Sequence, residues 1–179
     1  MDPIGRIRAL RSGISKVMAA SKQHQLVPAG TKAPDFRLKR LAGGETSLGD
    51  LLANGPVLLA FFKVTCPVCQ LTLPFLERIH AAGTLPIYGI SQNDPEDTRE
   101  FIQEFGITFP MLLDEEDNRY PASNAYGIST VPTMFLVERD GAVSRVIEGW
   151  SKQDIQQLGG TAGVQAIRPS DNVPAFKSG

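Results

Sequence analysis

The chain has 179 residues, of which 42% are hydrophobic, and a formal net charge of −1 at pH 7. This length predicts one domain with extensions, and the hydrophobic content excludes a chain that is disordered over most of its length. The near-zero net charge points to no particular class of partner. Two cysteines are too few for the disulfide framework of a stapled secreted mini-domain.

Residues 1–29 are predicted to form an amphipathic helix and a linker. Apolar residues recur at spacings of three and four between Ile4 and Met18, with basic residues on the other sides. Such a helix would dock on the domain or on a second subunit, or lie on a membrane surface. The segment has no aromatic residues with which to stack on nucleic acid, so we expect no nucleic-acid partner.

The sequence predicts a soluble protein. No run reaches the roughly 18 apolar residues of a membrane span. Arg6, Arg8 and Arg11 interrupt the position where a signal peptide would have its apolar core. We therefore expect a cytoplasmic location, and a periplasmic one only if the chain is a trimmed form of an exported protein. These patterns specify no oligomeric state.

Residues 30–160 alternate between strand and helix patterns. The expected strands are 36–39, 45–48, 56–62, 85–90, 109–113, 133–137 and 143–147. The expected helices are 48–53, 67–82, 94–105, 122–126 and 152–158, with Asp94 and Ser151 as N-caps, Gly106 ending the third helix and Gly159-Gly160 ending the last. Strands separated by helices indicate parallel βαβ units, and the turn at Asp140-Gly141 indicates an antiparallel edge. The fold class is therefore α/β, a mixed sheet flanked by helices, with an extended or loose tail over residues 161–179.

The two cysteines form the segment Cys66-Pro67-Val68-Cys69, between the most apolar run and the start of a helix. Residues three apart lie on one face of a helix, so the two sulfurs can meet. Cys66 is expected at the helix cap, where unpaired N–H groups and the helix dipole stabilise a thiolate. Pro67 suits the first helical position, since its missing N–H would be unpaired there. The thiolate is the nucleophile in disulfide exchange, so this arrangement predicts redox chemistry.

Three other interpretations of the cysteine pair are open. A structural zinc site needs about four ligands, and His24 and His80 lack the spacing to complete one. A structural disulfide would close too small a ring to restrain the unfolded chain much. Two inert buried thiols are the third alternative. We favour a redox-active pair and expect no metal and no cofactor.

The chain resembles the thioredoxin-like superfamily over roughly residues 30–160. The resemblance rests on the strand that leads into Cys66-Pro67-Val68-Cys69, on Pro74 inside the following helix, on Val131-Pro132-Thr133 before a strand, and on the hairpin at Asp140-Gly141. The opening Ala33-Pro34-Asp35-Phe36 and the additional strand and helix at 85–113 are similar to the redoxin branch. That branch includes the alkyl hydroperoxide reductase/thiol-specific antioxidant proteins and the thioredoxins of cytochrome maturation.

The resemblance implies that the Val131–Pro132 bond is cis and packs against the cysteines. In the superfamily, the backbone before this proline pairs with an extended substrate segment. Thr130, Val131 and Pro132 are therefore the expected substrate-binding residues.

The chain also departs from the superfamily's patterns. Thr65 stands where thioredoxins have tryptophan, Ala60 where they bury a proton-accepting aspartate, and Thr72 where the cytochrome-maturation type has glutamate. The usual base for the second thiol is thus missing. Lys63 is a candidate supporting residue that would lower a thiol pKa, or else a solvated lysine. The proline and threonine that precede a peroxiredoxin cysteine are not at the required spacing.

These observations predict a thiol–disulfide oxidoreductase with Cys66 and Cys69 as catalytic residues. Its partners would be a disulfide-containing protein or small thiol and a reductant. The alternatives are a thioredoxin-fold peroxidase with antioxidant activity and a non-catalytic redox-sensing or binding module.

Overall fold

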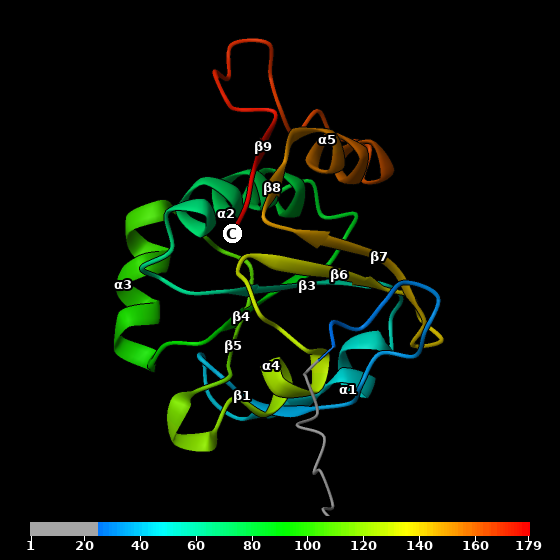
Figure 1. Cartoon of the computed structure of the whole chain (residues 1–179), viewed down its shortest axis with the longest axis vertical. Coiled ribbons are helices and arrows are strands. Elements are labelled where there is room, and N and C mark those ends of the chain that lie inside the picture. Colours follow the sequence, from blue (N-terminus) through cyan, green and yellow to red (C-terminus); the bar gives the residue numbers. More distant parts are fainter. Residues whose placement is uncertain (1–24) are drawn as a thin grey trace, which may run out of the picture.

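The computed structural model describes residues 25–179, so the predicted N-terminal helix lies outside the described residues. Within them, seven strands form one mixed sheet in the order β2-β1-β5-β4-β3-β6-β7 (Figure 1). The strands are β1 (Arg37–Arg40), β2 (Glu45–Ser47), β3 (Val57–Phe62), β4 (Ile87–Ser91), β5 (Met111–Leu113), β6 (Thr133–Val137) and β7 (Val143–Glu148). β3, β4 and β5 are parallel to one another, and the remaining pairs are antiparallel. The predicted α/β fold with an antiparallel edge is confirmed.

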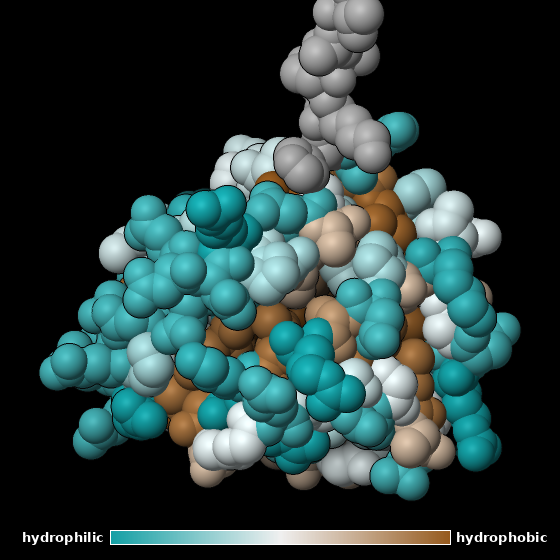
Figure 2. Space-filling view, turned by 90° about the horizontal axis from the view of Figure 1, so that it is seen from below, coloured by the Kyte–Doolittle hydropathy of each residue, from teal (hydrophilic) through white to brown (hydrophobic). Residues whose placement is uncertain are grey.

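Helices cover both faces of the sheet. One face carries α2 (Pro67–His80), α3 (Pro95–Phe105) and α5 (Lys152–Thr161), and the other carries α1 (Leu48–Leu52) and α4 (Pro121–Tyr126) (Figure 1). Figure 2 looks at the side of α1 and α4, which is mostly hydrophilic with hydrophobic residues visible between polar ones.

The position of the central strand β3 in the sheet explains why its sequence is apolar throughout. All six residues are buried, and alternate side chains enter different cores. Leu58, Ala60 and Phe62 join the core under α2, α3 and α5, and the other three residues join the core under α1 and α4. A strand covered on both faces must be apolar throughout, which is why this run does not alternate.

Helix ends follow local chemistry. The Asp94 side chain accepts the N–H of Asp97 at the start of α3, and Gly106 ends the helix in the left-handed conformation, as predicted. The predicted end of α5 at Gly159 is wrong, because the helix runs on to Thr161. A Cβ at Gly159 would lie 2.6 Å from the carbonyl oxygen of Val164, so glycine here permits a close approach of chain and does not stop the helix.

The sequence did not predict three short elements: the 3-10 helix η1 (Glu116–Asn118) and the strands β8 (Trp150–Ser151) and β9 (Phe176–Lys177). β8 and β9 form a separate two-stranded antiparallel sheet. Its second strand lies in residues 162–179, which we call the C-terminal segment. The division of the chain into N-terminal helix, domain and tail stays a prediction.

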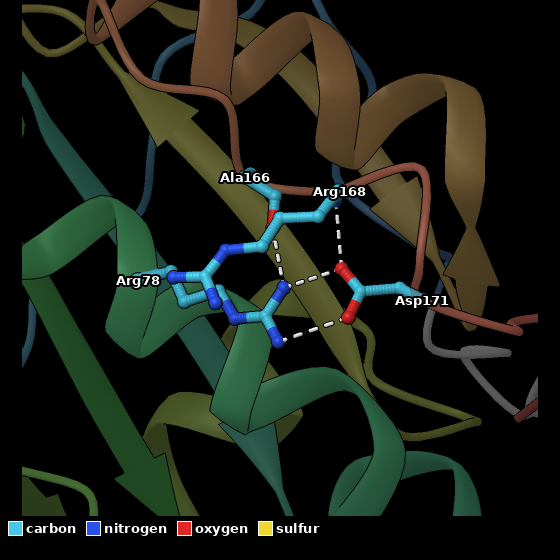
Figure 3. Close-up of polar contacts among 4 residues, drawn as sticks. All are labelled: Arg78, Ala166, Arg168 and Asp171. Atoms are coloured by element: carbon cyan, nitrogen blue, oxygen red, sulfur yellow. Dashed lines mark hydrogen bonds and ion pairs between the residues drawn. The ribbon is translucent and has the colours of Figure 1, made fainter.

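An ion pair attaches the C-terminal segment to α2 (Figure 3). Arg78 donates to both carboxylate oxygens of Asp171, at 2.6 and 3.2 Å, and to the carbonyl oxygen of Ala166 at 3.1 Å. The N–H of Arg168 donates to the same carboxylate at 2.7 Å. The hydrogen bonds from Arg78 and from the Arg168 backbone lower the pKa of Asp171 from 3.8 to about 2.

The contribution of Asp171 to stability is therefore predicted to depend on acid. A carboxyl group whose pKa is lower in the folded state stabilises the protein above its unfolded value near 3.8, and this stability is lost as the pH falls towards about 2. We expect Asp171→Asn to lower Tm at neutral pH by about 1–3 °C, as for a partly exposed ion pair, and the difference from wild type to vanish between about pH 4 and 2. Thermal unfolding against pH measures this. Asp117→Asn, at an exposed position in η1, is the control. A Tm difference that stays constant down to about pH 2 would contradict the assignment.

Candidate active site

The turn after β3 places Cys66 at the start of α2. Cys66 is the N-cap, with Pro67 at the first helical position, and its sulfur accepts the N–H of Cys69 at 3.3 Å. Two side chains hold the turn: Asn93 accepts the N–H of Val64 at 3.0 Å, and Gln70 donates to the carbonyl oxygen of Val64 at 2.9 Å. The sequence-based placement of Cys66 and Pro67 is confirmed.

The two thiols have different surroundings. Cys66 is partly exposed, whereas Cys69 has no exposed surface. Burial raises the pKa of the Cys69 thiol well above its ordinary value, and the hydrogen bond with the Cys66 side chain raises it further, against a smaller opposing effect of the Lys63 backbone. Cys69 is therefore a neutral thiol near pH 7, shielded from solvent, and Cys66 is the accessible sulfur.

The loop before β6 completes the site. The Val131–Pro132 bond is cis, as the resemblance implied. The Cys66 thiol donates to the carbonyl oxygen of Val131 at 3.3 Å. The Thr133 hydroxyl donates to the carbonyl oxygen of Thr130 at 2.8 Å and braces the loop. The structure thus brings the loop against Cys66, with Thr130 exposed beside it.

Two hollows that share Lys63, Gln92 and Tyr120 lie near the site and differ in charge, and the loop lines only the first of them. A hollow of about 230 Å³ is polar and nearly uncharged, and its lining includes Lys63, Gln92, Ser123, Thr130 and Val131. The second, of about 450 Å³, is acidic, and its lining includes Lys63, Thr65, Asp94, Asp97, Glu115, Glu116 and Asp117. Lys63 is exposed and lines both hollows, and its backbone carbonyl accepts the N–H of Cys66 at 3.2 Å.

The two positions where the superfamily places an acid are occupied by other chemistry. Ala60 is buried in the core of β3, between Gly89 and Met134 of the neighbouring strands. Thr72 is also buried, and its hydroxyl donates to the carbonyl oxygen of Val68 at 2.7 Å. Among residues 25–179, no group of three or more histidine, cysteine or acidic side chains is arranged to hold a metal ion.

The residues that support the site were not predicted from the sequence. Gln92 and Asn93 follow β4 directly, and Gln92 donates to the Ser123 hydroxyl at 2.7 Å. Because parallel strands end at the same edge of a sheet, residues after β3 and β4 were bound to meet, and this signal was available. Asp114 directly follows β5, which is parallel to β4, so the same signal was available for it. It is buried and accepts the N–H groups of Ala122 and Ser123, which fixes α4 beside the smaller hollow.

An accessible thiol at a helix start, with a buried thiol one turn further and a proline loop across from it, defines a thioredoxin-like thiol–disulfide oxidoreductase that uses a C-x-x-C pair. Within that class, the chain belongs to the AhpC/TSA family, whose sequence profile matches residues 29–146.

Individual relatives agree with this class. The thiol-disulfide oxidoreductase ResA of Geobacillus thermodenitrificans (strain NG80-2) is 34% identical over 136 residues, which are 73% of this chain and 76% of the relative. The thioredoxin domain of a thiol-disulfide oxidoreductase from Bacteroides vulgatus has a TM-score of 0.67 at 24% identity and covers 75% of this chain and 97% of its own. Peroxidoxin BcpB from Mycobacterium tuberculosis has a TM-score of 0.61 at 21% identity, over 75% of this chain and 92% of its own. At these identities the two structures show the fold alone.

The different surroundings of the two thiols predict selective alkylation. In the reduced native protein, we expect iodoacetamide to label Cys66 more than about tenfold faster than Cys69, because Cys69 is buried and protonated. Mass spectrometry of the digested protein measures both rates. In guanidinium chloride the two rates should become similar, which is the control. Equal labelling of the native protein would mean that Cys69 is not shielded.

Proposed function

We propose that Cys66 is the nucleophile and Cys69 the resolving thiol of this thiol–disulfide oxidoreductase. The observation that carries the assignment is the contrast in access: Cys66 is open to solvent at the helix cap, and Cys69 is buried behind it. Only Cys66 can meet a bulky disulfide, and only Cys69 is held one helical turn away to displace it.

The reaction follows from these positions. Cys66 loses its proton, gives up the bond to the Val131 carbonyl and attacks a substrate disulfide, which releases one substrate thiolate and forms a mixed disulfide. The N–H of Cys69 still donates to the Cys66 sulfur in the thiolate. Cys69 then loses its proton and attacks the Cys66 sulfur, so that the second substrate thiol leaves and a 66–69 disulfide remains. A reductant partner restores the two thiols.

The loop at Thr130, Val131 and Pro132 supports the proposed substrate contact. The Val131 carbonyl is 3.3 Å from the Cys66 sulfur, so a backbone that pairs with this residue would hold its disulfide close to the nucleophile. Pro67 supports the site as the first residue of α2, directly after Cys66. Lys63 supports it by placing a cation beside the smaller hollow.

Whether the enzyme reduces or oxidises its substrates depends on the reduction potential of the Cys66–Cys69 pair relative to that of its compartment. The cytoplasmic location expected from the sequence stays a prediction, and it would favour reduction of substrate disulfides. No helix within residues 25–179 is long and apolar enough to cross a membrane. The same steps run in reverse would oxidise a substrate dithiol.

Serine substitutions test the two roles. We expect Cys66→Ser to lower the rate of disulfide reduction by more than about 1,000-fold, because no accessible thiol remains. Cys69→Ser should instead form the mixed disulfide through Cys66 and stop there, which mass spectrometry detects as one covalently held substrate. Circular dichroism of both variants checks the fold.

The opposite pattern would overturn the assignment. Trapping in Cys66→Ser would make Cys69 the nucleophile. Rapid peroxide consumption by Cys69→Ser, with sulfenic acid on Cys66, would instead indicate the antioxidant peroxidase. A wild-type protein that reduces neither protein nor small disulfides would indicate the non-catalytic redox-sensing or binding module.

A further inference from the structure

The C-terminal segment reaches the loop that faces Cys66. In the β8–β9 pair, Trp150 lies opposite Lys177 and Ser151 opposite Phe176. Beyond β9 the backbone of Gly179 packs against Val131, because a Cβ built on Gly179 would lie 2.3 Å from the Val131 carbonyl oxygen and 2.8 Å from its carbon. The same carbonyl oxygen accepts the Cys66 thiol at 3.3 Å. The segment and the nucleophile thus meet at one backbone group.

Glycines allow this close packing. Gly149 has a φ of +69°, and a Cβ on it would lie 2.4 Å from the carbonyl oxygen of Lys177 and 3.0 Å from the nitrogen of Gly179. A paired strand needs about 4.8 Å between its backbone and that of its neighbour. A substrate strand and residues 177–179 cannot share the space beside Val131.

The first part of the C-terminal segment is anchored in the core by Ala162, Ala166 and Ile167, whereas the contacts that hold residues 171–179 are few and mostly polar. They are the Arg78–Asp171 ion pair (Figure 3), the 2.7 Å hydrogen bond from the Trp150 indole to the Pro174 carbonyl, and the 2.9 Å bond from the Lys152 N–H to the Ala175 carbonyl. Residues 174–179 are exposed, and Phe176 is 63% exposed, so little apolar surface is buried here. A segment with few buried apolar contacts opens at low free energy.

We propose that residues 176–179 determine substrate specificity by occupying the place of an extended substrate backbone beside Val131. This inference rests on the proposed function of Cys66. A polypeptide disulfide must displace the segment before it pairs with Val131. A small disulfide does not have to pair with Val131, and the smaller hollow beside this residue, lined also by Gln92 and Thr130, has no lining residue from the segment. The enzyme therefore favours small disulfides over extended polypeptides as long as the segment is in place.

Gly179→Ala is the sharpest test of this proposal. Its methyl group would overlap backbone atoms of Val131, which cannot move aside as a flexible side chain would, so residue 179 must move away from Val131. Gly160→Ala is the matched control, since a Cβ there meets no atom within 4 Å and no left-handed φ is required. Asp171→Asn is a second test, because it weakens the Arg78–Asp171 ion pair eight residues earlier and adds no atom near the site. It therefore controls for the case in which the new methyl group itself blocks Val131.

The assay compares the reduced enzyme with insulin, a polypeptide disulfide, and with oxidised glutathione. We expect kcat/KM for insulin to rise about threefold to tenfold in Gly179→Ala and in Asp171→Asn, because the fraction of binding-competent molecules rises. The value for oxidised glutathione should stay unchanged in both, and Gly160→Ala should match wild type with both substrates. In the mixed disulfide of Cys69→Ser with an insulin chain, the amides of Phe176 and Lys177 should exchange faster than in the free protein.

The possible failures are distinguishable. The specificity role is overturned if Gly179→Ala and Asp171→Asn reduce both substrates but the ratio of kcat/KM for insulin to that for oxidised glutathione is unchanged or lower than in wild type. That result would leave the proposed function of Cys66 intact. If wild type and all variants reduce neither disulfide, the proposed function itself fails.

Discussion

The site depends on the position of one sulfur between two backbone groups. The Cys66 sulfur lies 3.3 Å from the N–H of Cys69 and 3.3 Å from the carbonyl oxygen of Val131, which is 65 residues away in the chain. The antiparallel pairing of β3 with β6 brings the two segments together, because Phe61 lies opposite Thr133 and the end of one strand faces the start of the other. A register slip would carry Val131 away from the sulfur and turn the strand's side chains to the opposite core.

The same position makes the two steps of exchange unequal. Cys66 has solvent access and an N–H donor, so the first attack needs little from the rest of the fold. Cys69 is buried with a raised pKa, and Ala60 and Thr72 supply no carboxylate to take its proton. Once Cys66 is part of a mixed disulfide, it has no thiol left to interact with Cys69. One of the effects that raise the pKa of Cys69 is then removed. In the proposed mechanism, resolution by Cys69 is still the step with the least support from the surrounding residues.

The features that could be predicted from the sequence are those that depend on residues close together in the chain. The apolar run of β3, the caps at Asp94 and Ser151 and the cysteine pair at a helix start each reflect chemistry within a few residues, and the structure has them all. The cis bond before Pro132 was predicted from the resemblance to the thioredoxin-like superfamily and not from composition. Gly159 misled the prediction and Gly179 gave no signal, because each is set by a close approach of backbone from elsewhere in the chain, which no local pattern encodes. The C-terminal segment was missed for the same reason.

Helix α2 links reactivity with access. Its first turn holds Cys66, and its last turn carries Arg78, which binds Asp171 of the C-terminal segment. Phe75 connects the two residues that hold the segment, because its ring centroid lies 4.5 Å from the Arg78 guanidinium and 4.9 Å from the ring centroid of Trp150. The Trp150 indole in turn holds the segment at Pro174. A substrate that displaces the segment as proposed would therefore act on contacts that end on α2, the helix that begins at Cys66.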